Sequence, residues 1–240
     1  MGVPITLPTL VLALSLLATS THPAQAREPI DVKMTIDRDT TVSDHIFVPE
    51  NTTLTIKPGV TIRFAEYRKL LVKGMLIAQG ADKAPILITG ADRAYGSTGH
   101  PSWDGLVIYG ARAHALLSHV RIEGAYKNLV WEANPVFESC EFVGNHYALY
   151  CIKRAAPHVE KCRIFRNVYG IVADYATPLL LDNVITENTI GVYLQLSTDL
   201  VAGKNTIKGN TTDLKTEQCL GPTKEPTSLQ QMWELMRQIY

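Results

Sequence analysis

The chain has 240 residues, of which 23 are basic and 23 acidic, so its formal net charge is zero. Charged residues make up 19% of the chain and hydrophobic residues 46%, which excludes a disordered polyelectrolyte. The balanced charge leaves no overall basic field, so we predict no nucleic-acid partner, and the length suits one or two domains.

The first 26 residues have the features of a secretory signal peptide. They contain no Lys, Arg, Asp or Glu, and their apolar run LVLALSLLA at 10–18 is too short to cross a bilayer as a helix. The small-x-small triplet at 24–26 predicts cleavage after Ala26. A buried N-terminal helix or an uncleaved anchor is the alternative. We predict an exported protein, periplasmic or extracellular, with no transmembrane segment after cleavage.

The stretch 27–52 precedes a region of strand-like patterns and is predicted to cover its open end. Runs of alternating apolar residues then follow at 53–64, 71–78, 85–90 and 103–109. A polar, glycine-bearing insertion at 91–102 separates the last two runs. Such an insertion either carries function or is a mobile loop.

The second half of the chain contains a repeat of 21 to 22 residues. Its clearest column consists of four asparagines, Asn145, Asn167, Asn188 and Asn210. Three more columns stay in register: Cys140, Cys162, Asn183 and Asn205; Phe142, Ile164, Ile185 and Ile207, extended backwards by Val120; and Leu149, Ile171 and Val192. Within each copy the apolar residues alternate as in a strand, and the runs are short.

These repeats predict a parallel β-solenoid over 53–212. One coil cannot bury its inward face alone, whereas stacked coils pair their strands in parallel and place like side chains above one another. At ~4.8 Å per coil, about seven coils are expected. The asparagine column is predicted to be a structural ladder at a turn, where the side-chain amide bonds the next coil.

Residues 213–240 are predicted to form an irregular linker followed by an amphipathic helix. At 228–240 the apolar residues share one helical stripe: Leu229, Met232, Trp233, Met236, Ile239 and Tyr240. Ser228 and Gln231 make a capping box at its start. The predicted role is a cap packed on the last coil, and docking to a partner is the alternative.

The repeat P-x-Φ-x-x-[CN]-x-Φ-x-x-N-x-x-G-Φ, seen at 157–171, resembles the repeat of the pectin-lyase-like superfamily. The opening strands at 53–109 are similar to the start of many secreted bacterial β-helix proteins. The resemblance covers 53–210 and implies an all-β fold, a right-handed single-stranded parallel β-helix. The superfamily includes polysaccharide lyases, polygalacturonases, epimerases and noncatalytic binding or structural proteins, so the fold does not choose a function.

The acidic and histidine residues do not form the sets that these enzymes need. There is no Asp-Asp, Asn-Thr-Asp or Gly-His-Gly sequence for inverting hydrolysis, and the acidic columns are too thin for a lyase calcium site. The histidines lack zinc-ligand spacing. We predict no catalytic residues, no metal and no cofactor, and leave open an unfamiliar site on the insertion or the exposed strands.

Cys140 and Cys162 share a column on adjacent coils, where a separation of ~4.8 Å falls within the Cα range of a disulfide. Export would permit oxidation. The alternative is a pair of stacked, buried thiols that replace asparagine in a turn ladder.

One lateral face is the predicted binding surface. If Leu149, Ile171 and Val192 point inward, then Tyr150, Val172 and Tyr193 point outward. Val130 is expected to extend this stripe and Trp131 to lie beside it, with Lys153, Asp174 and Gln195 at the edge. Aromatic faces bordered by polar groups suit sugar rings, although tyrosine is also an ordinary exposed strand residue.

Together these patterns favour an exported, noncatalytic scaffold or binding protein. Its expected partner is a polysaccharide or another envelope protein, bound through the lateral face or the C-terminal helix. A carbohydrate-active enzyme, such as a polysaccharide lyase, an epimerase or a glycoside hydrolase, is the alternative.

Overall fold

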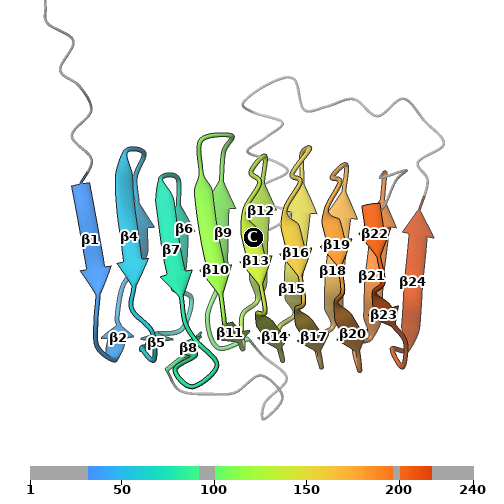
Figure 1. The fold of residues 1–240 in the computed structure, drawn as a ribbon, viewed down its shortest axis with the longest axis horizontal. Helices are drawn as coiled ribbons and strands as arrows, with labels where there is room; N and C mark the ends of the chain where they lie inside the picture. Colours follow the sequence, from blue (N-terminus) through green and yellow to red (C-terminus); the bar gives the residue numbers. More distant parts are fainter. Residues whose placement is uncertain (1–31, 92–100, 197–200, 218–240) are drawn as a thin grey trace, which may run out of the picture. The chain divides into compact units, whose positions relative to one another are not determined.

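The computed structural model describes residues 32–91, 101–196 and 201–217, and all regular structure in these ranges is β-strand. The strands form three parallel eight-stranded sheets (Figure 1). Sheet A contains β1 (Val32–Ile36), β4 (Thr52–Ile56), β7 (Met75–Gln79), β10 (His114–Ser118), β13 (Val136–Glu138), β16 (His158–Glu160), β19 (Leu179–Leu181) and β22 (Val201–Gly203). Sheet B contains β2 (Thr40–Val42), β5 (Thr61–Phe64), β8 (Ile86–Gly90), β11 (Val120–Glu123), β14 (Glu141–Val143), β17 (Arg163–Phe165), β20 (Val184–Thr186) and β23 (Thr206–Ile207). Sheet C contains β3 (Ile46–Val48), β6 (Lys69–Val72), β9 (Gly105–Tyr109), β12 (Lys127–Trp131), β15 (Tyr147–Ile152), β18 (Tyr169–Asp174), β21 (Ile190–Gln195) and β24 (Thr212–Glu217).

Each coil of the solenoid supplies one strand to each sheet in the order A, B, C, which makes eight coils. The sequence predicted about seven, beginning at Thr53. The additional coil is β1–β3, which lies within the stretch 27–52 expected to cover the end. It pairs in parallel with β4–β6, so this stretch covers the second coil by adding a coil of its own. The last strand, β24, lies within the predicted linker.

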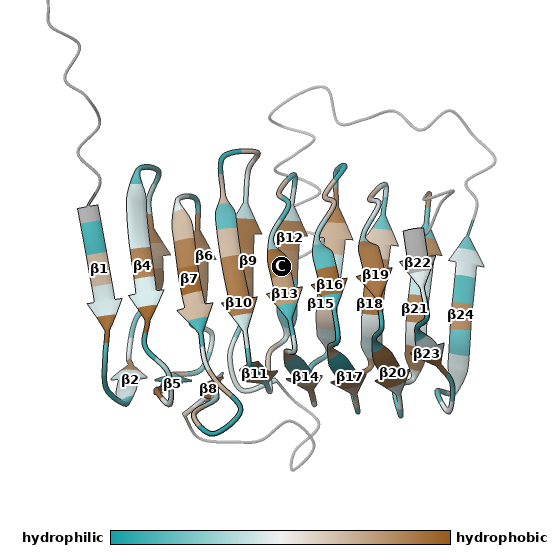
Figure 2. Ribbon diagram, viewed as in Figure 1, coloured by the Kyte–Doolittle hydropathy of each residue, from teal (hydrophilic) through white to brown (hydrophobic). Residues whose placement is uncertain are grey.

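Aligned columns of apolar side chains fill the interior. Register pairs Ile122 with Phe142, then Phe142 with Ile164 and Ile164 with Ile185. The backward extension of this column to Val120 was wrong, because the coil from Ile122 to Phe142 is two residues shorter than the later coils. Figure 2 shows the hydrophobic bands recurring from strand to strand. Burying each large side chain stabilises the fold by roughly 1.5–3 kcal/mol.

The predicted asparagine column lies inside the turn between sheets B and C. The Asn167 side-chain Oδ1 accepts hydrogen bonds from the backbone N–H of Asn145 at 2.8 Å and from Asn145 Nδ2 at 3.0 Å. Asn167 Nδ2 donates to the carbonyl of Phe142 at 3.0 Å and to Asn188 Oδ1 at 2.9 Å. Asn145, Asn167 and Asn188 are buried, so this ladder satisfies backbone groups that water cannot reach.

A second ladder occupies the turn between sheets A and B. The carboxamide oxygen of Asn183 accepts from the backbone N–H of Cys162 at 2.9 Å, and Asn205 Oδ1 accepts from Asn183 N–H at 2.9 Å. Cys162 Sγ takes the same acceptor position toward the N–H of Cys140 at 3.4 Å. Both cysteines are buried free thiols. Each lies near a carbonyl of the preceding coil, that of Leu117 or Phe137, so the structure has the stacked-thiol alternative and not the disulfide.

Candidate functional site

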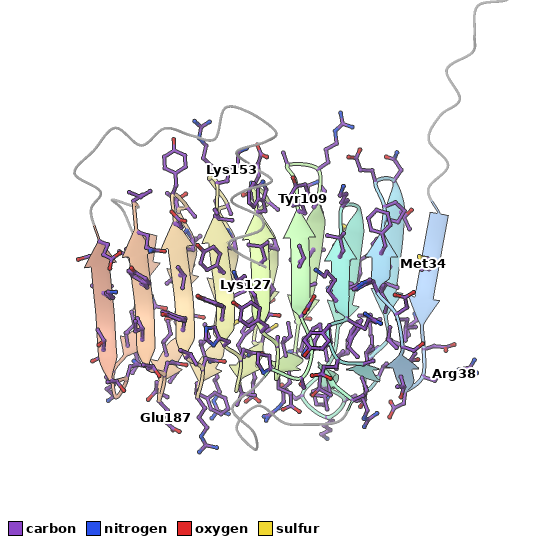
Figure 3. The ribbon with its side chains drawn as sticks, turned by 180° about the vertical axis from the view of Figure 1, so that it is seen from behind. Met34, Arg38, Tyr109, Lys127, Lys153 and Glu187 are labelled. Atoms are coloured by element: carbon purple, nitrogen blue, oxygen red, sulfur yellow. The ribbon has the colours of Figure 1, made fainter. Side chains whose placement is uncertain are left out.

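The outer face of sheet C carries three columns of outward side chains (Figure 3). The start column, at the beginning of the strands, is Lys69, Gly105, Lys127, Tyr147, Tyr169, Ile190 and Thr212. The middle column is Leu71, Val107, Leu129, Tyr150, Val172, Tyr193 and Lys215. The end column is Tyr109, Trp131, Ile152, Asp174, Gln195 and Glu217.

The structure brings the sequence-predicted surface residues together on this face. Tyr150 and Tyr193 occupy the middle column, while Trp131, Asp174 and Gln195 share the end column. Lys153 follows in the next turn, with its Nζ 5.6 Å from the Trp131 ring. These residues do not form an open stripe, however, because Trp131 and Tyr193 are buried although they point away from the core.

The expected extension of the stripe by Val130 was wrong. The pairing of β12 with β15 shifts between Lys127 and Leu129, so that Leu129 aligns with Tyr150 and Val130 faces the core. A bulge of this kind inserts one residue and reverses the alternation beyond it.

Polar groups in the middle and end columns bond to one another. The Tyr150 hydroxyl donates to Asp174 Oδ2 at 3.3 Å, and Gln195 Nε2 donates to the Tyr193 hydroxyl at 3.0 Å. Burial raises the pKa of the Asp174 carboxyl, and the hydrogen bond from Tyr150 partly opposes that shift. Burial also raises the pKa of Tyr150, and the neighbouring Asp174 charge adds to it. Tyr150 therefore stays protonated as a donor near neutral pH.

Sequence reasoning missed four half-buried rings around the start column, Tyr126, His146, Tyr147 and Tyr169, which we call the aromatic strip. The rings of Tyr147 and Tyr169 stack with centroids 4.7 Å apart and an interplanar angle of 9°. The His146 ring lies 4.7 Å from Tyr147 and 5.3 Å from Tyr126. These contacts join three successive coils into one aromatic surface.

Strict alternation concealed this strip. Counting back from the inward Leu149 would turn Tyr147 inward too, yet Ala148 and Leu149 both belong to the core, so Tyr147 faces outward. The 22-residue spacing of Tyr147 and Tyr169 was the available signal.

Lys127 is buried at the centre of the aromatic strip. Its Nζ lies 4.9 Å from the ring centres of both Tyr147 and Tyr150 and 5.5 Å from that of Tyr126. Burial lowers the pKa of Lys127 to about 8. Burial, followed by the nearby Lys127 charge, also lowers the pKa of His146. The three rings offset part of the cost of burying the ammonium group.

Sheet B carries a separate hollow of about 420 Å³, beside strands β8, β11 and β14. Its charged side chains pair with one another: His119 Nδ1 lies 3.0 Å from Asp82, and Arg121 Nη1 lies 3.0 Å from Glu141. Glu141 also contacts Arg163 at 2.7 Å, as the sequence suggested. These are cross-coil ion pairs of small energetic value. No cluster of three or more metal-ligating side chains occurs within the described ranges.

Eight stacked coils with three parallel sheets define a β-solenoid whose chemistry is carried on its lateral faces. The family model described as "Right handed beta helix region" matches residues 86–219, more than half of the chain. The protein belongs to the right-handed β-helix family, and the predicted fold class is confirmed. The predicted C-terminal helix, the insertion at 92–100 and the signal peptide lie outside the described residues.

No curated protein and no solved structure matches the chain significantly. Within the ranges that the structure describes, no helix is long and apolar enough to cross a bilayer.

Proposed function

We propose that this protein is an exported, noncatalytic β-helix scaffold that binds a polysaccharide through the aromatic strip. The stacking of Tyr147 on Tyr169 across adjacent coils, flanked by His146, carries the proposal. The C–H faces of sugar rings pack on aromatic faces, and polar groups around the rings supply orientation. A repeated glycan matches a repeated surface because successive sugars can meet successive coils.

Lys127 indicates the charge of the glycan. At neutral pH a group with a pKa of about 8 is mostly protonated, so the strip encloses a cation. A carboxylated or sulfated polysaccharide complements this charge better than a neutral one. We therefore expect acidic glycans to bind more tightly than neutral ones.

A glycan-array screen of the mature protein tests the proposal. Tyr147→Ala and Tyr169→Ala should each weaken binding of the best acidic glycan about tenfold, which corresponds to ~1.4 kcal/mol. Tyr67→Ala is the matched control, since this exposed tyrosine lies in the turn between β5 and β6, outside the strip. Failure to bind any glycan, or equal losses in all three variants, would refute the proposal.

A carbohydrate-active enzyme remains the second candidate, and Lys127 is the observation that favours it. A lysine with a pKa lowered to about 8 can act as a proton acceptor near neutral pH. Product analysis on any glycan that binds separates the two functions. New unsaturated or reducing ends that disappear in Lys127→Met would establish the enzyme, whereas binding without products supports the scaffold.

Export is part of the proposal and rests on the signal-peptide pattern of residues 1–26. Mass spectrometry of the protein recovered from the periplasm or the medium should give a chain that begins at Arg27. A chain retained in the cytoplasm with residues 1–26 intact would contradict export.

A further inference from the structure

The outer face of sheet C holds an apolar cluster that is separate from the core. Its members, which we call the apolar patch, are Leu71, Val107, Tyr109, Leu129, Trp131, Tyr150 and Ile152. The patch spans β6, β9, β12 and β15, and adjoins the aromatic strip at Tyr150. The register places all seven side chains outside the solenoid.

The patch is nevertheless shielded. Leu129 and Trp131 are each only 2% exposed, whereas the outward-facing Leu116 on sheet A and Val184 on sheet B are 38% and 41% exposed. All 24 described strands are used in sheets A, B and C, so no described strand lies over this face. A large ring on the outside of a solenoid becomes this inaccessible only when another layer covers it.

We propose that the C-terminal segment 228–240 docks as an amphipathic helix on the apolar patch. The segment presents six apolar side chains on one helical stripe, including Trp233 and Met236, which complements an apolar surface. The other stretches outside the described ranges fit less well: 92–100 and 197–200 are short and polar, and only 27–31 precedes the described strands once the signal peptide is removed.

The length of the segment fits the distance it must cover. It leaves the solenoid after Glu217, the last residue of β24, which is itself a strand of sheet C. Four strand spacings, ~19 Å, separate β24 from β12 at the centre of the patch. The ten residues 218–227 can extend to ~33 Å, and a helix of 13 residues is ~20 Å long, comparable to the width of the patch.

The open end of the stack argues against the capping position expected from the sequence. Leu214 in β24 aligns with the core residue Val192 and therefore faces the inside of the last coil. It is 53% exposed, so the interior of that coil is not covered. A helix packed on the end of the solenoid would bury Leu214 before it buried Trp131.

Photocrosslinking in the full mature chain tests the docking. A benzophenone amino acid in place of Trp233 should crosslink within the same chain to β9, β12 or β15. The same probe in place of Gln238, on the opposite side of the predicted helix, should give at least fivefold less of this product. Crosslinks to β24, crosslinks between isotopically distinct copies, or no crosslink to the solenoid would each overturn the proposal.

A second pair of variants guards against an effect of the probe itself. Met236→Asp places a charge in the apolar stripe, and Gln238→Asp places the same charge on the polar side. Met236→Asp should increase binding of a hydrophobic dye severalfold while the strand circular dichroism is unchanged, and Gln238→Asp should leave dye binding as in the parent. Equal dye binding in the two variants would overturn the docking, whatever the result of the glycan screen.

Discussion

The Asp213 carboxylate Oδ1 accepts two hydrogen bonds from Asn210, one from its backbone N–H at 3.0 Å and one from its Nδ2 at 2.9 Å. Asn210 Oδ1 accepts the same pair of bonds from Asn188, each at 2.9 Å. Asp213 thus takes the place that a further asparagine would have in a ninth coil. A carboxylate suits this position because it accepts hydrogen bonds without leaving a donor of its own unsatisfied.

We therefore predict that Asp213→Ala lowers the melting temperature, whereas Asp213→Asn, which keeps an acceptor, lowers it less. Thermal unfolding followed by circular dichroism measures both. Asp182→Ala, in a turn of an earlier coil with no role in this ladder, is the control. If Asp213→Ala melts like the parent, the carboxylate does not stabilise the end of the ladder.

The same contact predicts a dependence on pH. The hydrogen bonds from Asn210 lower the pKa of Asp213 in the folded protein. The stabilisation is therefore complete above the unfolded pKa of about 3.9 and is lost as the pH falls through the lower folded value. The melting temperatures of the parent and Asp213→Asn should converge below about pH 4. A gap that widens in acid would contradict this assignment.

Asn167→Ala should cost about 2–5 kcal/mol of unfolding free energy. It removes the acceptor of the Asn145 N–H and the donor to the Phe142 carbonyl, and each buried group left unpaired costs ~1–3 kcal/mol. Urea denaturation provides the measurement. The exposed Asn134, whose Oδ1 accepts one bond from the N–H of Ala156, is the matched control, and Asn134→Ala should cost below ~1 kcal/mol.

The buried cysteines should be unreactive in the native protein. Burial raises the pKa of the Cys140 thiol and raises that of Cys151 to about 12, and only a thiolate reacts with Ellman's reagent. In a Cys219→Ser background, no thiol should react before denaturation and three should react in denaturant without reductant. A single reactive thiol after denaturation would instead indicate a Cys140–Cys162 disulfide.

Lys127→Met should stabilise the protein at neutral pH. Because burial lowers the pKa of Lys127 to about 8, the unfolded chain binds more protons between about pH 8 and 10.4, and stability rises with pH across that window. Below pH 8 the full cost remains, at most ~3 kcal/mol, from which the ring contacts and residual solvent subtract.

Urea denaturation at pH 7 and at pH 9.5 checks this expectation. The advantage of Lys127→Met should be larger at pH 7 than at pH 9.5, while Lys83→Met, at an exposed turn, should change little at either pH. A variant that is destabilised at both would show that the cation stabilises its surroundings.

The repeat period predicted the stacking because a solenoid's long-range contacts follow its local order. Residues one period apart must be neighbours, so Asn145 and Asn167, or Ile171 and Val192, could be paired without coordinates. The prediction failed where the period changed. The short coil before Phe142 moved the column from Val120 to Ile122, and the bulge after Lys127 turned Val130 inward.

The sequence by itself determined the coil, its family and its two polar ladders, because each depends on spacing along the chain. Tertiary structure alone decided which outward residues are accessible. Trp131 and Tyr193 point away from the core, as predicted or nearly so, yet they are buried, while Tyr147 and Tyr169 lie partly open around Lys127. Exposure is a property of everything that packs over a residue, and segments remote in sequence contribute to it without leaving any periodic trace.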